Sequence, residues 1–147
     1  MASENIRPVM TAEEVNTYLA QVYPQLNDTL AEYYAVSVGP GQCVVRLDAS
    51  QKHVRPGGTV SGPSLFTLAD IGGYVCVLSH LGQEALSVTT NLNINFMRKA
   101  EPGPIDGYCR ILKMGRSLMV FDIEMRSTTD GHVVAHATGT YSIPPRK

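Results

Sequence analysis

One acidic residue stands alone in the most apolar stretch of the sequence. Asp70 is the only formally charged side chain between Arg55 and Glu84. An ionised carboxylate in an apolar setting is costly unless it is paired or hydrogen-bonded. The residue therefore has either a structural partner, such as a backbone or tyrosine group, or a chemical task of the kind that functional acids perform. The sequence leaves both readings open.

The loop that precedes this acid suits close contact with a ligand. Gly57, Gly58 and Gly62 have no side chain, so the backbone can approach a bound molecule. Backbone amides at a helix N-terminus point outward with partial positive charge, and such donors stabilise the oxyanion of an acyl-transfer transition state. Because Pro63 has no amide hydrogen, the donor is Gly62 or Ser64, and we favour Gly62.

Several cations are placed where they could hold an anionic ligand. Arg98 and Lys99 follow the longest predicted strand, and Arg116 lies in the next predicted hairpin. Guanidinium and ammonium groups bind phosphates through charge-assisted hydrogen bonds. At strand ends the same residues also serve as solubilising or edge-protecting groups, which is the alternative interpretation.

A long buried helix must carry Asp70. Pro63 suits the first position of a helix, and the apolar residues from Leu65 to Leu78 cover nearly the whole circumference, which is typical of a helix enclosed by protein. The helix is expected to end near Leu81-Gly82. Asp70 then lies about 10 Å along the axis from Pro63.

Alternating apolar residues predict a sheet around this helix. A capping box beginning at Thr11 predicts a short helix that stops before Pro24. In a predicted hairpin within 31–50, Tyr34, Val36 and Val38 alternate, as do Cys43, Val45 and Leu47. Further strands are expected at 86–97, with its even-numbered residues as the apolar face, and at 105–114, 118–127 and 132–143.

This order of elements predicts an α+β fold. A curled antiparallel sheet of five to six strands surrounds one long central helix, with a short N-terminal helix. The 147 residues, 44% of them hydrophobic, suffice for a single domain, expected at 11–147 after a tail at 1–10. A net charge of -1 does not favour nucleic acid or an anionic membrane as partner. The N-terminus has no apolar leader, so we expect a cytoplasmic protein.

The cysteines and histidines predict no metal site. Cys43, Cys76 and Cys109 are odd in number and widely spaced, so we expect reduced core residues. The four histidines form no pair with metal-ligand spacing.

Two segments resemble the PaaI-like acyl-CoA thioesterases. They are His53-Val-Arg-Pro-Gly-Gly-Thr-Val-Ser-Gly-Pro63, followed by Leu-Ala-Asp70, and Thr89-Thr-Asn-Leu-Asn-Ile-Asn-Phe-Met-Arg98. The resemblance covers about residues 45–143. It implies a hot-dog fold, active sites at a dimer interface, dimers that often pair into homotetramers, and no cofactor apart from the coenzyme A of the substrate.

The resemblance also implies roles for individual residues. Asp70 becomes the base that activates water, or the nucleophile, and the Gly62 amide becomes the donor to the thioester carbonyl. Thr89 matches a Ser or Thr that in relatives helps to place the water from the neighbouring subunit. Arg55 stands where many relatives have Asn, and would donate to the carbonyl or hold a coenzyme A phosphate. Ser61 begins the Ser-Gly-Pro that replaces their His-Gly-Gly.

We expect the substrate to contact the residues of the loop and of the basic strand end, namely His53, Ser61, Arg98, Lys99 and Arg116. Two other functions remain open. One is a non-catalytic acyl-CoA binder, favoured by the departures at Arg55 and Ser61. The other is a hydratase or dehydratase, for which His53 is the candidate loop base.

Overall fold

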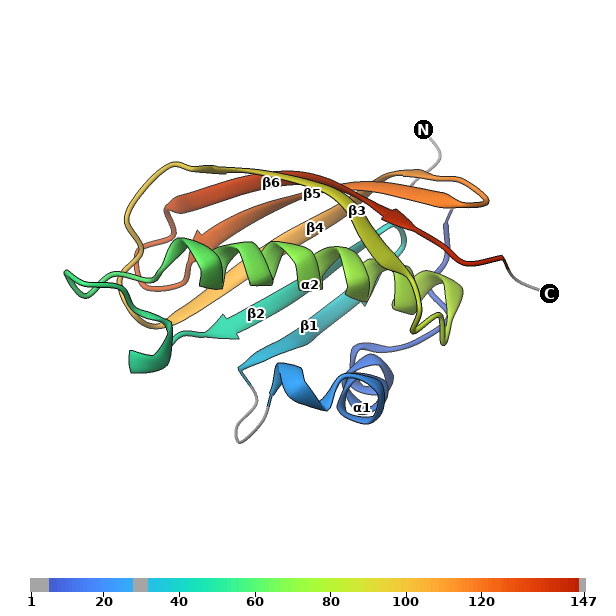
Figure 1. Cartoon of the computed structure of the whole chain (residues 1–147), viewed down its shortest axis with the longest axis horizontal. Coiled ribbons are helices and arrows are strands. Elements are labelled where there is room, and N and C mark those ends of the chain that lie inside the picture. Colours follow the sequence, from blue (N-terminus) through green and yellow to red (C-terminus); the bar gives the residue numbers. More distant parts are fainter. Residues whose placement is uncertain (1–5, 28–31, 146–147) are drawn as a thin grey trace.

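The computed structural model describes residues 6–27 and 32–145 and consists of one sheet wrapped around one helix. Six antiparallel strands in the described residues follow the order β1-β2-β4-β5-β6-β3. Figure 1 shows the long helix α2 lying across the sheet, with the short helix α1 beside β1. The predicted α+β hot-dog arrangement is confirmed. The strands are β1 Tyr33–Gly39, β2 Gln42–Asp48, β3 Val88–Phe96, β4 Pro104–Met114, β5 Leu118–Ser127 and β6 Val133–Ser142.

Helix α2, Gly62–Leu81, forms the centre of the core. It begins one residue earlier than predicted because Ser61 is the N-cap, with its side chain accepting the amide of Ser64 at 3.3 Å. By length and composition α2 could cross a membrane, yet 72% of its most apolar window is buried inside the protein. That burial is what a core helix needs. Phe66, placed by the apolar pattern on the buried surface, is instead 42% exposed.

Two glycines let α2 lie close to the sheet. A Cβ built on Gly73 would stand 2.5 Å from the ring of Phe121 and 2.8 Å from that of Tyr141. A Cβ on Gly72 would meet the terminal methyl of Ile123 at 2.6 Å. Real Cβ atoms do not approach this closely, so the absence of side chains here sets the depth at which α2, and with it Asp70, sits in the sheet.

The chain before α2 contains one α-helix and two single-turn helices, and its first described residues are hydrogen-bonded to the end of α2. Helix α1, Ala12–Val22, has the predicted capping box at Thr11, with bonds of 2.8 and 3.1 Å to Glu14. Two single-turn helices, Pro24–Leu26 and Gln51–His53, lie outside α1 and α2. Residues 6–10 of the predicted tail run along the end of α2, where the amides of residues 9 and 10 bind the carbonyl of Ser79. Residues 1–5 of that tail lie outside the described residues.

The predicted faces of two strands are only partly right, and each of these strands has a bulge that shifts its alternation. In β1 the buried residues are Tyr33 and Ala35, and the irregularity after Ala35 lets Val38 return to the core. In β3 a similar shift follows Thr89, and only Leu92 and Ile94 of the predicted apolar face pack against the core. The other apolar side chains of that face are exposed, namely Leu86, Val88 and Phe96.

The three cysteines meet inside the core. They are free and fully buried, with Sγ–Sγ distances of 3.2 Å from Cys43 to Cys76 and 3.4 Å from Cys76 to Cys109. The cysteines come from β2, α2 and β4, and their wide spacing in the sequence did not predict that they would be in contact. Burial raises the pKa of Cys109 well above its ordinary value, because the thiolate is poorly solvated in the apolar layer. Cys109 is therefore held as the protonated thiol.

Candidate active site

The carboxylate of Asp70 is held by two hydroxyl groups of its own chain. Thr89 donates its side-chain hydrogen bond to Oδ1. Tyr141 also donates to Oδ1, at 3.0 Å, and its hydroxyl lies 2.8 Å from the Asp70 carbonyl oxygen. Oδ2 makes no hydrogen bond to a described residue. One oxygen is therefore fixed, and the other is available to water or substrate.

A cavity of about 300 Å³ opens beside this carboxylate. The end of α1, the middle of α2 and the start of β3 enclose it. Two of its aromatic walls, Tyr74 and Tyr141, stack with ring centroids 5.9 Å apart. The lining residues are Val22, Tyr23, Asp70, Ile71, Tyr74, Ala85, Ser87, Val88, Thr89 and Tyr141. Asp70 thus combines a tyrosine partner with access to a pocket that can hold a small ligand.

Tyr141 is a site residue that sequence reasoning missed. It follows Ala135, Ala137 and Gly139 on the inner face of β6, where the preceding residues are small and apolar. A large residue with a polar hydroxyl at the end of this row is the signal from which the sequence could have identified it. Burial raises the pKa of Tyr141 well above its ordinary value, and the charge of Asp70 adds to the effect. The phenol therefore stays protonated and remains a donor at any working pH.

The residues expected around the carbonyl donor lie at a second cavity. Gly62 is the first residue of α2, and its amide donates no hydrogen bond to a described residue. The cavity, of about 380 Å³, brings Gly62 together with Arg55, Arg98 and Lys99, while Phe96 forms part of the wall. A Cβ on Gly62 would lie 3.3 Å from the Phe96 ring. Three cations and a free helix-terminal amide make this cavity suited to an anion.

His53 and Ser61 support the loop rather than the ligand. His53 is 3% exposed. Its Nδ1 accepts the amide of Ser50 at 2.9 Å, which leaves Nε2 to donate to Glu32 at 3.0 Å. The carbonyl of His53 accepts the Ser61 amide at 2.7 Å, and the Ser61 hydroxyl caps α2. Neither ring nitrogen of His53 is available to a substrate, so the expectation that it contacts the ligand is revised, and the hydratase reading loses its candidate base.

Glu32 completes this support. Its side chain is buried and also receives a hydrogen bond from Lys52 at 2.7 Å. Burial by itself raises the pKa of Glu32, and the hydrogen bonds from Lys52 and His53 outweigh it, so the net pKa lies below the ordinary value of 4.5. The cluster anchors the loop that leads into the N-terminus of α2.

The structure of one chain corrects two expectations, the subunit from which Thr89 reaches Asp70 and the position of Arg116. Thr89 binds Asp70 of its own chain, so relative to Asp70 it does not come from a neighbouring subunit. Arg116 lies in the β4–β5 turn, and the end of β4 contacts Gly41, whose amide donates to His80 in the last turn of α2. Arg98 and Lys99 lie beside its N-terminal end. The three cations do not converge in one chain.

The two cavities are separated along α2. Gly62 and Asp70 are eight residues apart on one helix, which corresponds to about 12 Å along its axis. A nucleophile or its water must come within about 3.5 Å of the carbonyl carbon. Within one chain, the Gly62 amide and the Asp70 carboxylate are therefore too far apart to act on the same carbonyl.

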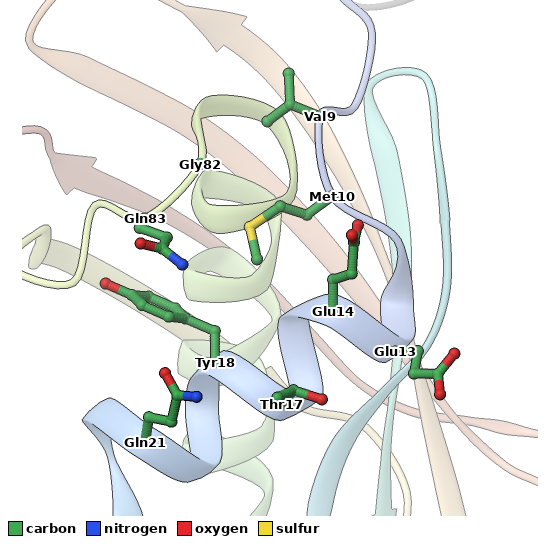
Figure 2. Close-up of a pocket in the computed structure, with 9 residues that line it drawn as sticks. All are labelled: Val9, Met10, Glu13, Glu14, Thr17, Tyr18, Gln21, Gly82 and Gln83. Atoms are coloured by element: carbon green, nitrogen blue, oxygen red, sulfur yellow. The ribbon is translucent and has the colours of Figure 1, made fainter.

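A third cavity, of about 500 Å³, lies between the N-terminal segment, α1 and the end of α2. Figure 2 shows Met10, Tyr18 and Gln83 around it, with Glu13 directed away from them. Glu14, which also lines it, is engaged in the capping box. None of the expected catalytic residues faces this cavity.

The six-stranded sheet curled around α2 is a hot-dog fold, and the half-buried Asp70 lines a cavity in it. The family model of the Thioesterase superfamily matches residues 57–134. The crystal structure of a candidate thioesterase from a Silicibacter species has a TM-score of 0.85 and 45% identity, covering 95% of this chain and 96% of that one. Mouse acyl-coenzyme A thioesterase 13 is 26% identical, over 80% of this chain and 84% of its own length. PaaI of Thermus thermophilus, 21% identical with a TM-score of 0.67 over 76% of this chain and 93% of its own, shares the fold.

This chain belongs to the thioesterase superfamily. The general class of its reaction is the hydrolysis of thioesters.

Proposed function

We propose that the protein hydrolyses acyl-CoA thioesters, with Asp70 as the reacting carboxylate. The observation that carries the proposal is the arrangement at Asp70, where two hydroxyls hold Oδ1 and Oδ2 makes no hydrogen bond to a described residue. A carboxylate fixed in this way needs no reorganisation when it takes a proton or attacks a carbonyl.

The complete site is proposed to form between two copies of the chain. Within one chain the Gly62 amide is about 12 Å from Asp70 along α2, too far for both to act on one carbonyl. Strand β3 is at the edge of the sheet and, among the described strands, pairs with β6 alone, and its Val88 and Phe96 are exposed. An unpaired, apolar edge strand suits pairing with the same strand of a second copy. Antiparallel pairing would bring Gly62 of one copy toward Asp70 of the other.

The basic residues near Gly62 are proposed to bind the coenzyme A phosphates. Arg55, Arg98 and Lys99 line the cavity that contains the Gly62 amide. A thioester whose carbonyl oxygen accepts that amide would have its phosphates close to these cations. A dimer of dimers is the assembly expected from the resemblance, and light scattering would measure its size.

The chemistry balances with water as the only co-substrate. As general base, Asp70 removes a proton from water while the oxygen attacks the carbonyl carbon, and the oxyanion is held by the Gly62 amide. The C–S bond then breaks, and the thiolate receives the proton. As nucleophile, Asp70 attacks the carbonyl carbon, the C–S bond breaks and coenzyme A leaves as the thiolate, and water then hydrolyses the mixed anhydride to the free acid and the Asp70 carboxylate. Turnover in ¹⁸O-labelled water distinguishes these routes, because only the anhydride route can place label in Asp70.

The test is thiol release from a panel of acyl-CoA esters by the wild-type protein and Asp70→Asn. We expect Asp70→Asn to reduce kcat at least about a hundredfold, because the amide cannot accept a proton or attack. Asp130→Asn, in an exposed loop, is the matched control and should retain activity. Full turnover by Asp70→Asn would disprove the role of Asp70, and tight binding without turnover by the wild type would favour an acyl-CoA binder.

A further inference from the structure

One large apolar side chain of the central helix is open to solvent. Phe66 is 42% exposed, whereas its neighbours on α2, Leu65 and Leu68, are buried. Its ring lines neither the cavity of Asp70 nor that of Gly62. A single exposed apolar residue is common on protein surfaces, so the meaning of this one depends on where it lies.

Phe66 lies midway between the two groups of the proposed site. It comes four residues after Gly62 and four before Asp70, so the three residues follow one another on one face of α2. Each step is about 6 Å along the axis. Gly62 and Asp70 are both partly exposed, and the sequence has no charged residue between Arg55 and Asp70. Two copies of this face can therefore approach each other without like charges at the midpoint.

Two-fold symmetry then fixes the position of Phe66 in the proposed dimer. If Gly62 of one copy lies close to Asp70 of the other, the same pair also meets at the second site. The two helix segments run side by side in opposite directions. Their midpoints cannot be farther apart than their paired ends, because the displacement of a midpoint is the mean of the displacements of its two ends. Phe66 is that midpoint in each copy.

The distance between the helices is short enough for the two rings to meet. An N–H···O bond of about 2.9 Å to the carbonyl oxygen and an approach of about 3.5 Å to the carbonyl carbon hold Gly62 and Asp70 of the two copies close together. A helix with its side chains is about 10–12 Å across. At that separation the side chains at the two midpoints touch.

Strand β3, which lies beside this face of α2, supports the same two-fold axis. A Cβ on Gly62 would lie 3.3 Å from the Phe96 ring, and Thr89 binds Asp70, so the ends of β3 lie next to the two groups of the site. The strand is at the edge of the sheet, and its Val88 and Phe96 are exposed. Antiparallel pairing of β3 with its copy brings together the same ends as the pairing of α2.

We propose that Phe66 packs against the partner's Phe66 on the two-fold axis, and that this pair sets the distance between the Gly62 amide and Asp70 in both sites. Phe66 is thus a positioning residue, since it acts through the spacing of the helices. A shift of about 1 Å in a reacting group can lower a rate about a hundredfold. The proposal rests on the proposed function, because the shared carbonyl places the second copy.

Cross-linking tests the contact without turnover. A short bismaleimide should join the two copies of Phe66→Cys, because the new thiols face each other. The native cysteines are at most 2% exposed and compete poorly. Gln83→Cys is the matched control, since this exposed position just past α2 lies more than about 40 Å from its counterpart across the proposed axis and should not be joined.

A second probe keeps an aromatic ring at the same position. With p-benzoylphenylalanine in place of Phe66, irradiation should attach the side chain to residues 62–70 of the other copy. Mixed dimers of ¹⁵N-labelled and unlabelled chains show by mass spectrometry that the attachment is between copies. Attachment to any other segment would overturn the contact.

Kinetics test the positioning role. Phe66→Ala, assayed where light scattering shows a dimer, should lower kcat about tenfold and change KM much less. Phe66→Leu refills most of the apolar volume and should restore most of kcat. Wild-type kcat in dimeric Phe66→Ala would overturn the role of the ring in setting the distance.

The two proposals fail in different ways. A dimer that cross-links at neither probe would overturn the Phe66 contact and the sharing of Gly62 and Asp70 between copies, while thiol release by that dimer would leave hydrolysis standing. Cross-linking at position 66 in a protein that hydrolyses no thioester would overturn the proposed function and leave the contact. A wild type that stays monomeric would overturn the contact and the two-copy site together.

Discussion

The two oxygens of the Asp70 carboxylate are unequal because of their neighbours. Oδ1 accepts hydrogen bonds from Thr89 and Tyr141, and Oδ2 accepts none from a described residue. A hydroxyl that binds the ionised carboxylate stabilises that form and fixes its orientation. Tyr141 is thus a positioning residue for Asp70.

Tyr141→Phe tests this positioning role. Loss of the hydroxyl bond to a charged group is expected to lower kcat about tenfold, in line with about 1.5 kcal/mol for such a bond. Because the hydroxyl orients Asp70, the loss should fall on kcat, with KM changed much less. Tyr108→Phe, on the exposed outer face of β4, is the control. An unchanged kcat would leave Tyr141 with a packing role alone.

Glu32 gives the protein a pH-dependent contribution to stability. The pKa of Glu32 is below its ordinary value of 4.5 in the folded state, so the contribution is present above pH 4.5 and is lost as the pH falls below it. Glu32→Gln should lower the free energy of unfolding at neutral pH, and its difference from wild type should shrink on acidification. Urea unfolding from pH 7 to about pH 3 measures this. The exposed Glu101→Gln should show no such trend.

The sequence identifies single residues with a chemical task better than it identifies the residues that contact them. Asp70 stands out because its surroundings along the chain are apolar. Tyr141 lies 71 residues from Asp70 in the sequence, so local spacing does not predict their contact. Local spacing also does not show that the Ser87 hydroxyl has no hydrogen-bond partner among the described residues. His53 looked like a ligand residue because its partner, Glu32, is remote in sequence.

The central element, α2, is placed by close contact with the rings and methyls of β5 and β6. At Gly73 the nearest groups are the rings of Phe121 and Tyr141, which cannot move without repacking. At Gly72 the nearest atom is the end of the flexible Ile123 side chain. The two glycines are adjacent, yet they differ in what a side chain would meet.

Gly73→Ala is therefore expected to destabilise the protein by about 1–2 kcal/mol, after the better helix propensity of alanine is taken into account. It should also lower kcat, since the added methyl pushes on the Tyr141 ring. Gly72→Ala should have the smaller effect on both. Urea unfolding and thiol release measure the pair, and equal effects would contradict the packing argument.

The elements themselves could largely be predicted, whereas their faces could not. Capping at Thr11, proline at position 63 and alternation in β5 follow from local rules, and the structure has each element close to where it was expected. Bulges after Ala35 and Thr89 depend on pairing with β2 and β6. A shift of one residue reverses which side chains are buried, so the alternation read from the sequence does not give the buried face along the whole strand.

For the whole molecule, the separated halves predict complementation between defective chains. Asp70→Asn lacks the acid, and Gly62→Pro lacks the donor amide. A heterodimer of the two would contain one intact site, so equal coexpression should restore about a quarter of wild-type activity in a randomly paired symmetric dimer. Each variant alone should be inactive. Continued inactivity of purified, mixed dimers would show that the two groups do not meet across subunits.

The sequence predicts one distance in the site and misses another. The separation of Gly62 and Asp70 follows from the predicted helix between them, which the structure has. The sequence grouped Arg116 with Arg98 and Lys99 as candidate cations for an anionic ligand. The strand topology places Arg116 at the opposite end of α2 from the other two.

The spacing of eight residues along α2 also makes concentration part of the mechanism. If the acid and the donor come from different copies, a dissociated chain has no site at all, however well it is folded. Below the dimer dissociation constant, specific activity should fall in proportion to dilution, and assays started from dilute stocks should show a lag while chains associate. The amount of protein in solution would then set its activity per molecule as well as in total.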